Sequence, residues 1–357
     1  MNKLTKVGCS ALCGSLAAIS AANAGDLTIT GGADMTWISA SDATTGNPIG
    51  IGSNTNIKGS GELDNGWTFD LTIANANKQA FSAAIINIDM GGLGKLNFNQ
   101  GNSGNGIAAI DDKMPTAWEE AWGNGLSTGV RLAVGSGASQ NVMYSTPTVL
   151  GTSMTFTFAP DYGTADTGDK ATAASEDGLG SSYDATININ PSLGTEILAG
   201  LNVFAGASTI EANDENAATD DRYEAVGGIT YSIGPLSLGY QRSGDYTGVD
   251  DTPESSGGDQ SAYNYYKAEA FGVAFNINDS LSVSYGEWEH IKAGWTDSNA
   301  NPVDEPDRTM TVESLQVAYT MGGMSLRVAD TQVTNAAWST AASEDKEATV
   351  ISMGLAF

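Results

Sequence analysis

Hydrophobic and polar positions alternate with a period of two residues along nearly the whole chain. The odd positions from Leu27 to Trp37 are apolar or small, and the even positions between them are mostly Thr or Asp. Such segments recur from residue 26 to residue 357, each of roughly ten residues, the length at which a tilted strand crosses a bilayer. Helical periodicity is scarcely visible. The chain is therefore predicted to be all-β, and each strand is predicted to have one apolar (greasy) face and one polar (wet) face.

Turn signals and polar stretches separate these segments in a regular order. Asp64-Asn65-Gly66 lies between two alternating runs and is a strong hairpin signal. Short turns of this kind alternate with longer polar stretches, the pattern of an antiparallel barrel with short turns at one end and long loops at the other. We expect about 16 strands, with both chain ends on the short-turn side. The long connections are expected near residues 40–53, 75–80, 101–139, 161–181, 208–221, 244–261, 294–308 and 335–346.

Two places break the alternation, because the apolar phase slips by one residue within 270–273 and within 312–315. We interpret both slips as β-bulges, which bend a strand and restore its phase. With these bulges, Lys267, Glu269 and Glu313 would stay on the wet face. The greasy face would then lack charge wherever the phase is clear.

A soluble barrel also alternates, so the choice of a membrane barrel depends on further features. Charge on a lipid-facing wall would cost roughly 2 to 4 kcal/mol near the bilayer midplane, which fits an uncharged greasy face. Aromatic residues near strand ends are typical of the girdles at the two membrane interfaces. The aromatic residues in such positions are Trp37, Trp67, Tyr183, Tyr223, Tyr231, Tyr263, Trp288 and Tyr319.

The first 24 residues have the pattern of a cleaved secretory signal: Lys3 and Lys6 precede an apolar stretch that ends in Ala22-Asn23-Ala24. Both cysteines fall within this segment, so a disulfide in the mature protein is excluded. Removing it leaves 13 basic against 42 acidic residues, a net charge of −29. A chain with this charge is not expected to bind nucleic acid. Since no linker divides residues 25–357, we predict one barrel domain there.

The last strand and three internal motifs carry a resemblance to a known family. The chain ends in an alternating strand that stops on Phe357, and the motifs are GELDNGWTF from Gly61, GKLNF from Gly94 and NVMYSTP from Asn141. Their order resembles the Gram-negative outer-membrane general-diffusion porins. The resemblance implies a 16-stranded transmembrane barrel with short periplasmic turns and long extracellular loops, usually a homotrimer in outer-membrane lipid. It also implies that Phe357 is an assembly signal read by the barrel-assembly machinery.

In that family the third long loop folds into the lumen and narrows a water-filled channel for passive diffusion of small hydrophilic solutes and ions. The matching connection here, residues 101–140, carries four carboxylates and two tryptophans. Carboxylates in a narrow lumen would concentrate cations, so we expect cation selectivity. An ordinary solvated surface loop is the alternative. The acidic candidates are Asp111, Asp112, Glu119 and Glu120, and Trp118 and Trp122, four residues apart, could share one face of a short helix.

Basic residues on the wall face the acidic loop in the family and create a transverse field. The candidates here are Lys58, Lys95, Arg131 and Arg327. The alternative is that each only pairs with a neighbouring lumen acid such as Glu62, Asp70 or Asp89. The small number of basic candidates favours cation over balanced or anion selectivity.

Other chemistry has weaker support. An enzyme would normally need a base such as His290, which we interpret as a chance surface histidine, so no catalytic site is expected. No metal site or cofactor is expected; the alternative is calcium at the acidic loops, because oxygen ligands suit it. Two alternatives stay open, a substrate-specific outer-membrane channel and a surface adhesin. The acidic loop residues are Asp166, Asp177, Asp214, Glu215, Asp250, Asp251, Asp304, Glu305 and Asp307.

Overall fold

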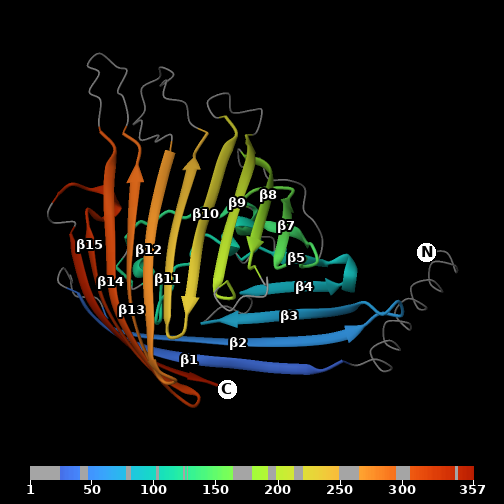
Figure 1. Ribbon diagram of the computed structural model, residues 1–357, viewed down its shortest axis with the longest axis horizontal. Helices are drawn as coiled ribbons and strands as arrows, with labels where there is room; N and C mark the ends of the chain where they lie inside the picture. The colour runs from blue at the N-terminus through green and yellow to red at the C-terminus, as the bar shows by residue number, and fades with distance from the viewer. Residues whose placement is uncertain are drawn as a thin grey trace, which may run out of the picture.

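The computed structural model is a single closed antiparallel barrel of 16 strands (Figure 1). Each strand pairs with its neighbours in the sequence, and β1 closes the barrel against β16. The predicted fold class and strand number are therefore confirmed. The residues described by the structure are 25–40, 47–77, 82–101, 104–123, 125–126, 128–163, 179–191, 198–212, 220–248, 265–294, 306–341 and 345–357.

The secondary structure consists of strands and short 3-10 helices. The strands are β1 (Leu27–Ala40), β2 (Ile49–Glu62), β3 (Thr68–Ala76), β4 (Ala83–Asp89), β5 (Lys95–Gln100), β6 (Gln140–Ser145), β7 (Thr152–Ala159), β8 (Leu179–Ile189), β9 (Leu201–Ala212), β10 (Arg222–Ile233), β11 (Leu236–Tyr246), β12 (Tyr265–Asn278), β13 (Leu281–Lys292), β14 (Arg308–Met321), β15 (Met324–Thr334) and β16 (Lys346–Ala356). The 3-10 helices are η1 (Gly91–Leu93), η2 (Gly106–Ala109), η3 (Ala121–Gly123), η4 (Gly135–Ala138) and η5 (Ala336–Trp338). Within the described ranges, no helix is long and apolar enough to cross a membrane.

The barrel closes along β1 and β16, which pair from Gly32 and Ala356 at the short-turn end to Ala40 and Ala348. Gly32 lies opposite Ala356, and the backbone amide of Phe357 donates to the carbonyl of Gly31 over 2.9 Å. Phe357 is 79% exposed and continues the outward phase of Leu355. The predicted signal segment, residues 1–24, lies outside the described residues and stays a prediction.

The two predicted β-bulges are wrong. Pairing of β12 and β14 with their neighbours is continuous through residues 270–273 and 312–315. In β12 a register shift lies instead between Asn276 and Asn278, beside the short turn. The apparent slips arise because the inner face also carries apolar or small residues there, such as Ala270 and Val312, both buried inside the barrel.

The expectation of an uncharged outer wall is also wrong on this side of the barrel. Without bulges, Glu269 has the same phase as the exposed Phe271, and Glu313 has the same phase as the exposed Leu315. Lys267 follows the phase of Glu269. All three predicted wet-face charges therefore point away from the lumen.

The aromatic prediction divides in two. Trp37, Tyr183, Tyr223 and Tyr319 are exposed on the outer wall, at 41 to 52% of their full surface, as expected of girdle residues. Trp288 is 1% exposed and lies inside the barrel, so its assignment to a girdle is wrong. Tyr263 lies outside the described residues.

Candidate functional site: the loop inside the barrel

The described residues of the connection between β5 and β6, 104–123, 125–126 and 128–139, lie inside the barrel, and the two ends of the connection are joined. At its start, the Asn105 side-chain amide donates to Asn97 Oδ1 over 2.7 Å and to Asn141 Oδ1 over 2.6 Å. At its end, Asn141 Nδ2 donates to the carbonyls of Ser136 and Ser139. A few amide side chains therefore close the base of the loop.

Asp184, on the inner face of β8, holds the same base from the opposite side. Its carboxylate accepts hydrogen bonds from the backbone amides of Ile107 and Ser136, at 3.0 Å each, and from the Ser136 hydroxyl at 2.8 Å. The backbone approaches it closely because two glycines flank these donors. Gly106 (φ +60°) and Gly135 (φ +46°) would each place a Cβ under 3 Å from the carboxylate.

Farther along the loop, a row of neutral and acidic acceptors on successive strands receives its backbone amides. Ser284 Oγ on β13 accepts from Ala117 N, and Gln316 Oε1 on β14 accepts from the amides of Trp118 and Glu119. Gln316 also donates back to the Glu119 carbonyl. Glu224 on β10 and Gln241 on β11 complete the row, accepting from Gly135 N and Lys113 N. The loop thus lies on the inner wall from β8 to β14.

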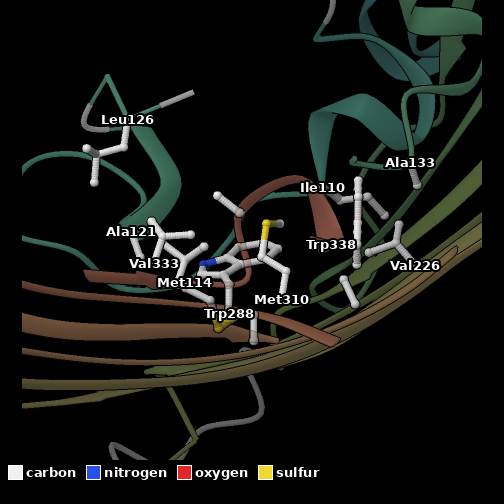
Figure 2. Close-up of a cluster of buried hydrophobic side chains, with 14 of the residues drawn as sticks. Ile110, Met114, Ala121, Leu126, Ala133, Val226, Trp288, Met310, Val333 and Trp338 are labelled. Atoms are coloured by element: carbon white, nitrogen blue, oxygen red, sulfur yellow. The ribbon is translucent and has the colours of Figure 1, made fainter. Parts of the chain in front are cut away.

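Apolar packing seals this contact (Figure 2). Met114 and Ala121 of the loop pack with Trp288, Met310 and Val333 of the wall in one buried cluster. Room for the loop comes from small wall residues, since a Cβ on Gly239 would lie 2.4 Å from Pro115 Cδ. Burying this apolar surface contributes roughly 25 cal/mol per Å² toward holding the loop in place. The loop therefore covers much of the inner wall from β8 to β15.

The opposite inner wall, on β2 to β5, is not covered in this way and borders a cavity of about 860 Å³. Two ion pairs line it, Lys58 Nζ to Asp70 Oδ1 at 3.4 Å and Lys95 Nζ to Asp89 Oδ2 at 2.9 Å. Asn87 Nδ2 donates to Asp70 Oδ1, which continues the polar row along the wall. Lys58 and Lys95 are thus paired with acids of their own wall, which agrees with the alternative that each pairs with a neighbouring lumen acid.

Two of the four predicted loop carboxyls are removed from water. Asp111 is 4% exposed, and the Oε2 atom of Glu120 is buried, close to the Trp288 indole. Desolvation, together with the nearby Asp112 carboxylate, raises the pKa of both Asp111 and Glu120 to about 8. At neutral pH both carry little charge, so they add little to the field of the lumen.

The other two predicted carboxyls are more accessible. Glu119 is exposed, and desolvation raises its pKa while the Arg327 guanidinium opposes that rise. Asp112 is half-buried, and burial raises its pKa against the effect of Lys113. These two groups are the accessible part of the acidic loop. The expected helix carrying both tryptophans does not form: η3 covers only Ala121–Gly123 and so excludes Trp118. The Trp118 ring centroid lies 5.8 Å from Cζ of the Arg327 guanidinium.

The two arginine candidates have different surroundings. Arg327 on β15 pairs with Asp34 Oδ1 at 3.2 Å and faces the loop at Trp118 and Glu119. Arg131 is part of the loop and pairs with the buried Asp245 over 2.5 Å. Arg327 therefore brings a basic wall residue to an acidic loop residue, whereas Arg131 fastens the loop to the wall.

Sequence reasoning missed the residues that hold the loop. None of Asp184, Glu224 and Gln241 was singled out from the sequence. The sequence does show acidic and amide side chains at alternating positions of consecutive strands, and such acceptors need donors if they are buried. The sequence does not identify the segment that supplies those donors. His290, expected at the surface, is 1% exposed and stacks on Trp288 with ring centroids 5.7 Å apart.

Comparisons with known proteins agree on the fold. No protein-family model and no curated protein sequence matches the chain. Among solved structures, it is similar to Salmonella typhi OmpF in complex with daunomycin (12% identity, TM-score 0.63, covering 94% of this chain and 98% of that one). An anion-selective porin from Comamonas acidovorans has 15% identity, a TM-score of 0.59 and coverage of 93% and 99%.

A trimer form of the Vibrio cholerae outer-membrane protein OmpT has 13% identity and a TM-score of 0.59, covering 94% of this chain and 100% of that one. The strand number, the closed antiparallel topology and this near-complete coverage agree with one another. The chain has the fold of the 16-stranded general porins.

Proposed function

We propose that the chain forms a channel of the Gram-negative outer membrane for the passive diffusion of small hydrophilic solutes and ions, with a preference for cations. The observation that carries this proposal is the division of the lumen. The described part of the loop between β5 and β6 lies on the wall from β8 to β14, and the polar wall at β2 to β5 borders the 860 Å³ cavity. A water-filled path would follow the uncovered wall.

Cation preference rests on the accessible charges along that path. Asp112 and Glu119 lie on the loop, and Asp26 and Glu62 line the cavity beyond the two ion pairs. A lumen with surplus carboxylates and low-dielectric walls attracts cations and repels anions. The structural neighbours do not decide this point, since one of them is an anion-selective porin.

The proposal extends to oligomeric state, assembly and secretion. A homotrimer in outer-membrane lipid fits the apolar outer faces of β1 and β2, and the OmpT neighbour is a trimer form. Phe357, exposed at the end of β16, is available to the barrel-assembly machinery. The segment 1–24 would direct secretion and then be removed.

The alternatives are less well supported. We propose no catalytic role, because the buried His290 cannot reach a substrate. A substrate-specific channel would need a dense ligand set, whereas the uncovered wall offers scattered Lys, Asp and Asn side chains. We propose no resident cofactor; no metal-binding cluster occurs in the described part of the chain. Calcium at the acidic loops stays a prediction, as all its candidate residues except Asp307 lie outside that part.

The test is the zero-current potential of the purified protein in a planar bilayer under a salt gradient. Asp112→Asn/Glu119→Gln removes the accessible loop charges, and Asp111→Asn/Glu120→Gln is the matched control for the buried ones. We expect stepwise conductance with cation preference that falls clearly in the first variant and little in the second at pH 6.

Other outcomes would change the proposal in different ways. Conductance without any change in the first variant would keep the channel but remove the loop from selectivity. A folded barrel that conducts no ions would contradict the channel itself. Heat-modifiable gel mobility reports folding in both cases.

A further inference from the structure

The outer wall of the barrel has an apolar band of unequal height. On β8, β9 and β10 the outward positions stay uncharged over residues 181–189, 201–209 and 223–233. On five consecutive strands, β11 to β15, the uncharged outward stretch measured from the short-turn end is much shorter. It covers residues 236–240, 271–277, 281–285, 315–321 and 324–328.

A charged outward side chain ends each of these short stretches. The five are Arg242, Glu269, Glu287, Glu313 and Asp330. They stand on adjacent strands, and the pairing places Arg242 opposite Glu269 and Glu287 opposite Glu313. Hence they form one continuous charged belt on the outside of the barrel.

The heights can be compared with a bilayer. At about 3.3 Å per residue and a tilt of about 45°, stretches of five to seven residues rise roughly 12 to 16 Å, against an apolar band of about 25 Å on membrane barrels. The stretches on β8 to β10 rise roughly 21 to 26 Å by the same reckoning. On β11 to β15 the wall is thus about 10 Å too short for an ordinary bilayer.

Tyrosines mark the upper limit of the short band. Tyr240 and Tyr285 occupy the last uncharged outward positions of β11 and β13. Tyr240 donates its hydroxyl to Glu269, and Tyr285 donates to Glu313 over 2.5 Å. A ring in the apolar band with its hydroxyl turned to charge is the usual arrangement at a membrane interface.

We propose that the hydrocarbon of the loop-side leaflet ends at Tyr240 and Tyr285 along β11 to β15, about 10 Å lower than along β8 to β10, and that lipid headgroups occupy the belt above. The partner of this surface is thus a locally thinned leaflet. A bilayer adapts to a short apolar stretch by thinning, at a modest cost per ångström. This inference rests on the proposed membrane location.

Matched cysteine labels test the proposal. The two cysteines of the sequence, Cys9 and Cys13, lie in the segment 1–24 whose removal is proposed, so an introduced cysteine is the single labelling site of the mature barrel. Glu289 on β13 and Ala225 on β10 both point outward, each eight residues from the short-turn end of its strand, at Leu281 and Ile233. Nitroxide-labelled Glu289→Cys and Ala225→Cys are compared in dioleoylphosphatidylcholine vesicles. Accessibility to oxygen reports hydrocarbon, and accessibility to a water-soluble nickel chelate reports the aqueous side.

We expect the Ala225→Cys label to favour oxygen, and the Glu289→Cys label to favour nickel several-fold more. Val283→Cys, low on the same wall as Glu289, should favour oxygen. In Glu287→Leu/Glu313→Leu the Glu289→Cys label should move toward oxygen, because the apolar band is extended. If Glu289→Cys folds poorly, Gln332→Cys on β15 replaces it, at the same height above Met324.

Equal oxygen preference at residues 289 and 225 would overturn the inference while leaving the channel intact. Nickel accessibility at all three sites, Val283→Cys included, would instead mean that the barrel does not insert. That outcome would contradict the proposed membrane location itself.

Discussion

The two inner walls of the barrel use polar residues in opposite ways. On β8 to β14, buried acceptors such as Asp184 and Gln316 bind the backbone of the inward loop. On β2 to β5, exposed ion pairs such as Lys58 with Asp70 border open space. Both walls show the same alternation in sequence. The difference teaches that another segment can bury a polar strand face, and that the polar groups of this face then position the covering segment.

The largest expected effect comes from removing the acceptor at the base of the loop. Asp184→Ala leaves the amides of Ile107 and Ser136 without their partner, at a cost on the order of 3 kcal/mol to loop docking. We expect a larger, noisier single-channel conductance and protease cleavage within residues 104–123. Asp89→Ala, on the uncovered wall, is the control and should leave cleavage unchanged. Identical digestion patterns for both variants would contradict the role given to Asp184.

A second effect follows from the buried carboxyls of the loop. The pKa of Asp111 and Glu120, about 8, lies above that of an unfolded chain, so the stabilisation of the docked loop is full below about pH 4 and is lost as pH rises through 8. Ionisation also adds negative charge. Cation preference should therefore increase between pH 6 and 9.

The zero-current potential measured across this pH range checks this expectation. Asp111→Asn/Glu120→Gln should flatten the pH dependence, because the variant has no buried carboxyl left to ionise. A slope that is the same in the variant and in the parent protein would assign the titration to other groups.

The smallest expected effect lies on the uncovered wall. Lys58→Met breaks an ion pair whose lysine side chain is 52% exposed, so the free energy of unfolding should change by about 1 kcal/mol or less. Removing one positive side chain from the lumen should shift the zero-current potential slightly, in the direction of greater cation selectivity. Lys58→Arg keeps the charge and should leave the potential unchanged. A midpoint of urea unfolding far below that of the parent protein would show that this wall is structural in the way the covered wall is.

Much of the fold could be predicted from the sequence because lipid and water impose a strict period of two. Turn residues such as Asp64-Asn65-Gly66 separate the alternating segments, so the number of segments predicts the strand number. The interpretation failed in β12 and β14, where the inner face beneath the loop carries Ala270 and Val312. There both faces are apolar, so alternation no longer tells inside from outside.

The candidate site was predictable only in part. The inward loop is marked by its length and its aromatic residues, but the burial of Asp111 and Glu120 depends on which wall the loop contacts. That contact is made by side chains distant in sequence, such as Gln316, 197 positions from Glu119. Local pattern carries no information about such pairs.

The most direct test of the difference between the two walls is thiol modification during conduction. Asn87→Cys lines the cavity, and Ser314→Cys replaces a residue that is 1% exposed on the covered wall. A charged methanethiosulfonate reagent added to the open channel should reduce the current through Asn87→Cys and leave Ser314→Cys unaffected. Rapid block of Ser314→Cys with no effect at Asn87→Cys would contradict the account, because ions would then pass along the wall on which the loop is placed.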